Sequence, residues 1–428
     1  MRNIVNRIKT SSYLKNLVAL SMSTVIAQLI VVSISPVLTR IYKPEELGAF
    51  TIIVTIVGMF TPIINGRYDV SIVAAEKDEE ANEVAVAGIF VSLIVSLFVG
   101  AGIWIYNYLN PGYFEAIGLW VYLSIPILVI VGINNILNSY NNRFQQYNLM
   151  ASVTVVKSVS QAILQVIFGL SKFGVGGLII SQFISLFFGL KRQARYLLQN
   201  RDHFRKIKLN NVWKVIKKYR NQPIYAAPAL FLNSLSYSIL VFLINELYGI
   251  KEVGYYSIAY SVLGMPIALI SANVSRVFFE RAIAERKEKG NFYSIFKKTT
   301  ILLGIVSFPF FVALFFMSQF LFEFIFGEGW GRAGVFVSIL SPMYAIRFVV
   351  SAVSLSLTIS NKQKIELLLQ AGFLIEALAV FFISKITNLG IEYFLGSISG
   401  LFLINYLAVF IVIARISKET YKGQRFND

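Results

Sequence analysis

The chain contains no cysteine and a single histidine, His203. The first absence excludes disulfides and thiol chemistry, and the second excludes a histidine-based zinc cluster. The nucleotide-binding pattern G-x-x-x-x-G-K-[ST] is missing as well, so nothing in the sequence indicates that the chain itself hydrolyses ATP. We therefore expect no metal and no other cofactor.

Charged residues are scarce: they make up 14% of the 428 residues, whereas 56% are hydrophobic, and the mean hydropathy is +0.68. Soluble domains carry about 25% charged residues. The apolar residues form blocks of about 20 or more, long enough for a helix to cross a bilayer and too long for barrel strands. The sequence predicts an all-α polytopic membrane protein with about twelve transmembrane helices, near 17–40, 47–70, 84–109, 116–137, 152–171, 175–194, 223–249, 254–279, 299–325, 335–359, 366–386 and 392–414.

Acidic residues are fewer than basic ones, 22 against 39, which leaves a net charge of +17. The basic residues gather in alternate connections: the N-terminus, the links 195–222 and 280–298, and the C-terminus. By the positive-inside rule these connections are cytoplasmic, so the charge is a topology signal and does not indicate nucleic acid. The first span is too long for a cleaved signal peptide, and we expect it to be retained. We expect both termini to lie on the cytoplasmic side of a bacterial inner membrane.

Part of the chain repeats. Tyr42, Gly48 and Gly58 recur as Tyr248, Gly254 and Gly264, at a constant offset of 206 residues that is close to half the chain. Internal repeats of this kind are typical of transporters with two lobes. The repeat predicts an N-terminal six-helix lobe at 1–200, a basic cytoplasmic linker at 201–222 that follows the inner membrane surface, and a C-terminal six-helix lobe at 223–428.

Polar residues inside the predicted spans are the candidates for function, because a charge at the bilayer centre costs at least about 2.5 kcal/mol. Helical spacing places Lys157, Gln161 and Gln165 on one face, and Arg347 on one face with Ser351 and Ser354. The other candidates are amides within spans and arginines close to span ends: Gln28, Asn134, Asn138, Asn233, Asn273, Arg40, Arg67 and Arg276.

Structural roles compete with functional ones at these positions. Hydroxyl and amide stripes also join transmembrane helices. Lys157 and Arg347 can form structural ion pairs, and arginines near span ends can extend to the lipid headgroups. The alternative is a watery cavity in which Lys157, Arg347, Arg276 and Arg40 bind phosphate and the amides bind sugar hydroxyls.

Two carboxylates are candidates for ion coupling. Glu376 lies in the middle of a predicted span, where a low dielectric disfavours the ionised form, so it could take up a proton. A salt bridge with a neighbouring cation is the structural alternative for Glu376. Asp69 follows Arg67 by two residues, and we expect a local ion pair between them at the cytoplasmic end of the span.

Four stretches resemble the Wzx-type oligosaccharide flippases of O-antigen and capsular polysaccharide pathways, within the multidrug/oligosaccharidyl-lipid/polysaccharide exporter superfamily. They are PVLTRIYKPEELGAF (36–50), GRYDVSIVAAEKDEEAN (66–82), EVGYYSIAYSVLGMPIALISANVSRVFFERA (252–282) and FGEGWGRAGVFVSILSPMYAIRFVVSAVSLSLTISNKQ (326–363). Arg40 lies in the first stretch, Arg67 and Asp69 in the second, Arg276 in the third and Arg347 in the fourth, whereas Lys157 lies outside all four.

The resemblance implies two pseudo-symmetric six-helix lobes around a central cavity. It also implies alternating-access transport of undecaprenyl-diphosphate-linked oligosaccharide from the cytoplasmic to the outer leaflet, coupled to an ion gradient. The expected partners are this lipid-linked substrate and membrane lipids, with a polysaccharide polymerase and a chain-length regulator as further candidates. We expect no enzyme activity.

Two other functions compete with this interpretation. A multidrug exporter of the same superfamily would favour an acidic cavity, whereas the deep charges here are mainly cationic. A membrane glycan polymerase or ligase would present large outer loops, and the predicted outer connections are short.

Overall fold

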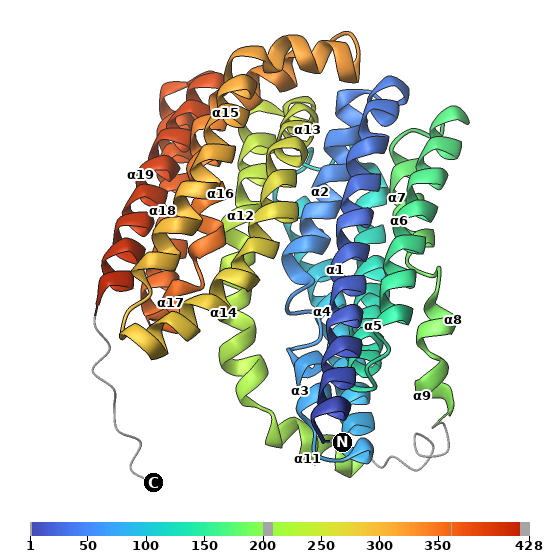
Figure 1. Ribbon diagram of the computed structural model, residues 1–428. Helices are drawn as coiled ribbons and strands as arrows, with labels where there is room; N and C mark the ends of the chain where they lie inside the picture. The colour runs from blue at the N-terminus through green and yellow to red at the C-terminus, as the bar shows by residue number, and fades with distance from the viewer. Residues whose placement is uncertain (1, 200–208, 361, 420–428) are drawn as a thin grey trace. The chain divides into compact units, whose positions relative to one another are not determined.

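The computed structural model describes residues 2–199, 209–360 and 362–419, and every regular element in these ranges is helical (Figure 1). This confirms the predicted all-α class. Residues 200–208, which include His203 and the start of the predicted linker, lie outside the described residues. Contacts divide the chain into two compact units, Met1–Ser238 and Ile239–Asp428. The lobe boundaries at residues 200 and 223 stay a prediction.

The first unit contains eleven helices and two shorter turns among its described residues, and its last helix continues into the second unit. They are α1 (Arg2–Ile41), α2 (Pro44–Phe60), α3 (Tyr68–Ala74), α4 (Asp78–Leu109), η1 (Gly118–Leu123), α5 (Ser124–Arg143), α6 (Tyr147–Leu170), α7 (Gly174–Ser185), α8 (Leu190–Gln193), α9 (Arg195–Gln199), α11 (Leu209–Lys218), the π-helical turn η2 (Gln222–Ala226) and α12 (Ala227–Tyr248).

The second unit continues from the end of α12. Its elements are α13 (Ile250–Pro266), the π-helical turn η3 (Ile267–Ser271), α14 (Ala272–Lys289), α15 (Tyr293–Phe326), α16 (Gly331–Val353), α17 (Ser356–Ile359), α18 (Gln363–Thr387) and α19 (Ile391–Lys418).

Ten helical stretches in the described residues are long and apolar enough to cross a membrane, and a bent pair at Gln222–Ser236 and Ser238–Tyr248 raises the number to eleven. The 17-residue helix α2 occupies the remaining predicted span. The predicted extent of that span, 47–70, is wrong, because α2 ends at Phe60 and a separate helix, α3, begins at Tyr68. Residues 61–67 between them form turns, and Gly66 and Arg67, directly before α3, adopt φ values of +58° and +65°, so no right-handed helix runs continuously from α2 into α3.

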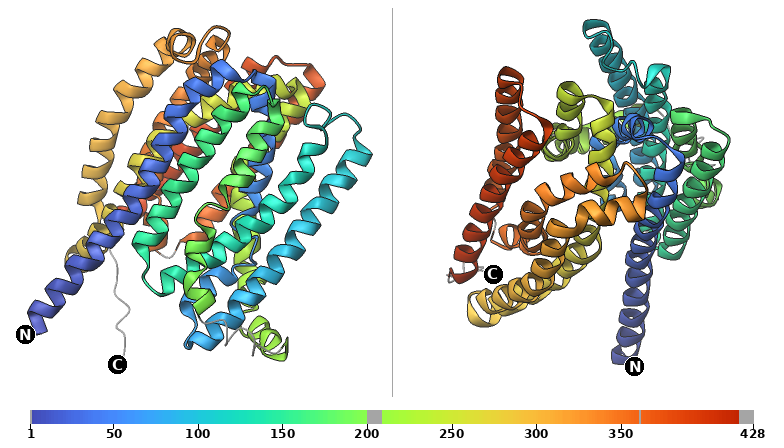
Figure 2. Two further views of the ribbon diagram at one scale, coloured as in Figure 1. Left: turned by 90° about the vertical axis from the view of Figure 1, so that its right-hand side faces the viewer. Right: turned by 90° about the horizontal axis from the view of Figure 1, so that it is seen from above.

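In the first unit, α1 packs along α6, α4 along α5, and α6 along α7 (Figure 2). A buried apolar cluster forms where α3, α4, α5 and α11 meet, and it includes Tyr68, Tyr140 and Val215. The short helix α11 turns Val215 toward this cluster and leaves Trp213 and Lys214 exposed. The helix at the end of the predicted linker is therefore anchored to the first unit by its apolar side.

In the second unit, α16 is the central helix and packs against α13, α14, α15 and α19. The approach of α15 to α16 depends on a small residue, because a Cβ on Gly334 would lie 2.5 Å from the Ser318 carbonyl oxygen. The Ser318 hydroxyl also donates to the Gly334 carbonyl at 2.7 Å. Small residues and hydroxyls at a helix interface are typical of packing in membranes, where the lipid supplies no hydrophobic force between helices.

The repeated tyrosines have equivalent contacts in the two units. The Tyr42 hydroxyl donates to the Gln165 carbonyl at 2.7 Å, near the end of α6. The Tyr248 hydroxyl donates to the Leu389 carbonyl at 2.9 Å, between α18 and α19. Each tyrosine lies at the end of a helix, α1 or α12, and ties that end to a more distant part of its own unit, which gives the sequence repeat a structural meaning.

Candidate functional site

The Lys157 ammonium lies within a cluster of amide side chains in the first unit. It donates to Asn134 Oδ1, and to Gln193 Oε1 at 3.4 Å. Gln193 Nε2 in turn donates to Asn138 Oδ1 at 2.7 Å. The cluster joins α5, α6 and α8, and it brings together three residues singled out in the sequence: Lys157, Asn134 and Asn138.

No carboxylate pairs with Lys157 among the described residues, so the ion pair considered from the sequence is not formed there. Asn134 and Gln193 are 5% and 1% exposed, whereas Lys157 is half-buried. Amide oxygens solvate an ammonium without neutralising it. Among the described residues, these amide contacts leave the positive charge of Lys157 without a neutralising partner.

Gln193 was missed by the sequence reasoning. It lies on α8 at the end of the predicted span 175–194, with basic residues on both sides, and this sequence is typical of a solvated connection. The only sequence feature that marks Gln193 is its position directly after Lys191 and Arg192. Helical periodicity relates residues of one helix, so it does not connect Gln193 to Lys157, which lies on another helix.

The other predicted sugar-binding amides do not join this cluster through any described hydrogen bond. Gln161 and Gln28 are half-buried, on α6 and α1, and Gln165 is 5% exposed. Asn233 keeps a buried Oδ1 with no hydrogen-bond partner among the described residues. Asn273 has a local role, because its Nδ2 donates to the Leu269 carbonyl at 2.6 Å within the irregular turn η3.

Arg347 lies against tyrosines in the second unit. Its guanidinium is 5.1 Å from the centroid of the Tyr344 ring, a cation–π distance, and it also interacts electrostatically with Tyr256 of α13. Tyr256 and Tyr344 are 3% and 2% exposed, and the rings of Tyr256 and Tyr260 lie 6.0 Å apart. The aromatic surroundings hold a guanidinium in a defined orientation, which suits bidentate recognition of phosphate. These tyrosines are not among the site residues predicted from the sequence.

Arg40 and Arg276, the other two predicted phosphate ligands, are both exposed. Arg40 Nη1 donates to the Pro36 carbonyl of its own helix at 3.3 Å. Arg276 lies on α14, one turn after Asn273. Neither residue shares a described contact with Lys157 or Arg347.

Glu376 has an amide partner. Asn405 of α19 donates from Nδ2 to Glu376 Oε1 at 3.2 Å, while Oε2 is buried with no hydrogen-bond partner among the described residues. Gly372, one turn earlier on α18, leaves room for this amide, because a Cβ there would lie 2.9 Å from Asn405 Nδ2. No described cation pairs with Glu376, so the salt bridge considered from the sequence is not formed there. A carboxyl with one unpartnered oxygen is suited to carry a proton.

Asp69 and Arg67 form the expected local ion pair, with 3.9 Å between Asp69 Oδ2 and Arg67 Nη1. Burial raises the pKa of the Asp69 carboxyl, while the Arg67 charge and backbone hydrogen bonds oppose the rise. Arg67 Nε is buried without a hydrogen-bond partner among the described residues. Both residues lie at the start of α3, on a different unit from Glu376.

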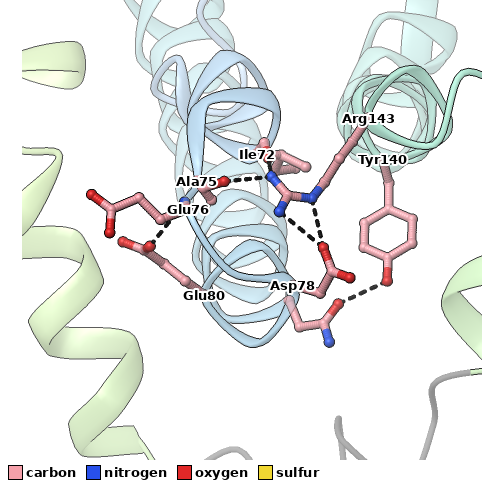
Figure 3. A network of polar contacts seen from close by, with 8 residues as sticks. Ile72, Ala75, Glu76, Asp78, Glu80, Tyr140 and Arg143 are labelled. Atoms are coloured by element: carbon pink, nitrogen blue, oxygen red, sulfur yellow. Dashed lines mark hydrogen bonds and ion pairs between the residues drawn. The ribbon is translucent and has the colours of Figure 1, made fainter.

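A polar network holds the segment that follows α3 (Figure 3). Arg143, the last residue of α5, donates from Nη1 to the carbonyls of Ile72 and Ala75 at 3.1 and 2.6 Å, and pairs through Nη2 with Asp78 Oδ1 at 2.9 Å. Tyr140 donates to Asn82 Oδ1 at 2.9 Å. The network fixes the connection from α3 to α4, and the sequence reasoning did not predict it.

A second set of contacts joins the same region to α11. Glu80 Oε1 accepts hydrogen bonds from Lys218 Nζ at 2.5 Å and from the Tyr219 hydroxyl at 3.2 Å. The Tyr68 hydroxyl donates to the Ile216 carbonyl at 3.4 Å. The stretch 66–82 therefore contacts α11 and the residue after it, which lie within the predicted linker 201–222.

An open groove of about 890 Å³ lies elsewhere on the first unit, between η1 and the connection from α6 to α7. Its lining includes Glu115, Trp120, Tyr122 and Phe173. None of the predicted site residues lines it, so its size alone does not mark it as the site.

Comparison with known proteins identifies the family. Residues 37–334 match the family described as "Polysaccharide biosynthesis protein". A stretch of 120 residues is 28% identical to the teichuronic acid biosynthesis protein TuaB of Bacillus subtilis (strain 168), and it covers 28% of this chain and 25% of TuaB. The match thus spans a quarter of the length of that relative.

Two solved structures share the fold. The lipid II flippase MurJ, in an inward closed conformation, has a TM-score of 0.70 at 12% identity, with 92% of this chain and 87% of MurJ covered. An inward-facing MATE-family multidrug resistance transporter of the MOP superfamily has a TM-score of 0.60 at 18% identity, with 94% and 95% covered. Since the family match extends over more than half of the sequence, this chain belongs to the polysaccharide biosynthesis family and has the two-lobed fold of the MOP superfamily.

Proposed function

We propose that this protein is a flippase that moves undecaprenyl-diphosphate-linked oligosaccharide repeat units, of the O-antigen or capsular type, from the cytoplasmic to the outer leaflet of a bacterial inner membrane by alternating access. The observation that carries the proposal is the Lys157 ammonium, held by amide oxygens with no described carboxylate partner. A charge inside a membrane span is energetically costly, so we expect Lys157 to be there to bind an anion. A lipid diphosphate is such an anion.

Arg347 contributes a second cation in this proposal. Its guanidinium, set against Tyr344, would take a phosphate oxygen pair, while the tyrosine hydroxyls and the amides would bind sugar hydroxyls. Arg40 and Arg276, both exposed, would assist at the ends of the path. Membership of the polysaccharide biosynthesis family supports a glycan as the cargo.

The test of this function compares Lys157→Ala with Lys77→Ala, an exposed lysine just before α4. The full chain is reconstituted in proteoliposomes with a fluorescent undecaprenyl-diphosphate oligosaccharide, and the fraction that reaches the opposite leaflet is measured over time. We expect Lys157→Ala to slow flipping at least about tenfold, since a hydrogen bond to a charged group is worth about 1.5–3 kcal/mol, and Lys77→Ala to leave the rate unchanged. Equal rates for both variants would remove Lys157 from the mechanism.

A multidrug exporter is the rival function, and the same proteoliposomes distinguish it. If the wild-type protein moved a lipophilic cation and left the lipid-linked oligosaccharide in place, the exporter would be the better description. If the protein moved neither but extended or ligated the glycan, a polymerase or ligase would replace both.

We further propose that Glu376 couples transport to a proton gradient. Glu376→Gln keeps the hydrogen bond from Asn405 and removes the exchangeable charge. We expect this variant to bind substrate normally and to lose the acceleration that an imposed pH gradient gives to the wild type. Acceleration equal to that of the wild type would exclude Glu376, and the same assay with Asp69→Asn tests the second carboxylate.

The topology and partners are part of the proposal. The basic connections support cytoplasmic termini and a linker at 201–222 between lobes 1–200 and 223–428, and a reporter fused at each end tests the orientation. A polysaccharide polymerase and a chain-length regulator are the partners that flipped repeat units would require, and co-purification from native membranes tests this association.

A further inference from the structure

Gln193 has a single possible orientation within its surroundings. Its Nε2 donates to Asn138 Oδ1 at 2.7 Å, so its Oε1 faces Lys157 Nζ at 3.4 Å. Its backbone carbonyl accepts a hydrogen bond from Asn141 Nδ2 at 3.0 Å. The residue is 1% exposed, and a buried amide with all of these contacts loses the freedom to rotate.

A glycine allows Gln193 to reach Lys157. Gly189 precedes α8 with a φ of +80°, which favours glycine. A Cβ at this position would lie 2.8 Å from both Cγ atoms of Val153, which is one helical turn before Lys157 on the same face of α6. The close approach of α8 to α6 therefore depends on Gly189, and it delivers the Gln193 oxygen to the ammonium group.

Because the groups that contact Lys157 are neutral amides, they do not cancel its positive charge. An ammonium group has three protons to donate, and Asn134 and Gln193 accept two of them. Both acceptors are neutral, so the site keeps its positive charge and one donor. A carboxylate in place of either amide would form an ion pair and cancel the charge.

We propose that Gln193 is a positioning residue of an anion site, which orients the Lys157 ammonium without neutralising it so that the third proton is donated to a phosphate oxygen of a lipid diphosphate. This proposal rests on the proposed flippase function. It adds a role for Gln193 and explains why this position holds a neutral amide.

The test measures binding to the full chain in nanodiscs with three probes of increasing charge: a short-chain polyprenol, its monophosphate and its diphosphate. The variants are Gln193→Glu, Lys157→Met and the double variant, with Gln145→Glu as the control. Gln145 is exposed in the connection between α5 and α6, so this control makes the same charge change outside the cluster.

We expect Gln193→Glu to weaken diphosphate binding by at least about tenfold and to leave polyprenol binding unchanged, because the new carboxylate forms an ion pair with Lys157. In the Lys157→Met background the same change should weaken diphosphate binding less than about twofold, because the cation through which it acts is gone. Gln145→Glu should bind all three probes as the wild type does.

Two results would overturn the positioning role: unchanged diphosphate binding by Gln193→Glu, or equal weakening for diphosphate and polyprenol. Additive effects of Gln193→Glu and Lys157→Met would overturn it as well. If Gln193→Glu does not fold, Gln193→Met provides the test, because it removes the amide without adding charge. This variant should weaken diphosphate binding and leave polyprenol binding unchanged. A wild-type protein that does not prefer the diphosphate to the polyprenol would instead refute the proposed function.

Discussion

Replacement of Arg143 by methionine should open the connection between α3 and α4, because this guanidinium holds three groups at once. It donates to the carbonyls of Ile72 and Ala75 and pairs with Asp78 (Figure 3). Ile72 and Ala75 are 0% and 6% exposed, so water does not readily replace the lost donor. Methionine keeps most of the side-chain length, so the stability lost in Arg143→Met comes mainly from the missing hydrogen bonds.

The magnitude follows from the surroundings of each contact. A buried acceptor left without a partner costs about 1–3 kcal/mol, so the two carbonyls together account for about 2–6 kcal/mol. The Asp78 carboxylate is 62% exposed, and an ion pair with such a group is worth about 0–1 kcal/mol. The carbonyl contacts therefore dominate the stabilisation by Arg143.

Amide hydrogen exchange in nanodiscs measures this effect locally. We expect exchange between Ile72 and Asp78 to rise by at least about tenfold in Arg143→Met, since the free energy of local opening falls by about 2 kcal/mol or more. Asp78→Asn is the matched control: it keeps both carbonyl contacts and should change exchange less than about fivefold. Equal effects of the two variants would refute the assignment of the stabilisation to the carbonyls.

Three further outcomes follow from the described contacts. Tyr42→Phe and Tyr248→Phe should each lower the free energy of unfolding by about 1 kcal/mol, seen as similar falls in melting temperature, and a fall in only one variant would contradict their equivalence in the two units. Gly189→Ala should lower the melting temperature and weaken diphosphate binding together, because the added Cβ pushes α8 away from Val153, and unchanged binding would contradict the role given to Gly189. Burial raises the pKa of Asp69, so the folded protein holds this proton more tightly than the unfolded chain; the stabilisation is present at low pH and is lost as the pH rises through the raised value. A pH titration of melting temperature should therefore show a fall in this window that Asp69→Asn lacks, and the same fall in the variant would assign it to another group.

The apolar blocks of the sequence predicted the helices well because length and hydrophobicity act locally along the chain. The second span shows the limit of this reasoning. The predicted span runs to residue 70, but α2 ends at Phe60, and the left-handed backbone at Gly66 and Arg67 separates it from α3. Hydropathy records composition and carries no information on φ.

The stripe on α6 predicted Lys157, and the amides of α5 predicted Asn134 and Asn138. Periodicity identified each set on its own helix, and the structure brought the two together. Gln193 and Arg143 were missed because their contacts depend on other helices: one reaches Lys157 by way of the turn at Gly189, and the other binds carbonyls of α3.

The sequence by itself determined the membrane class, the positions of most spans, the repeat and the polar residues that a bilayer makes costly, because each follows from the chemistry of neighbouring residues. Tertiary structure alone decided which of these residues meet. That Lys157 faces amides and that Glu376 faces Asn405 depends on the packing of helices distant in the chain, and this packing sets the charge of the candidate site.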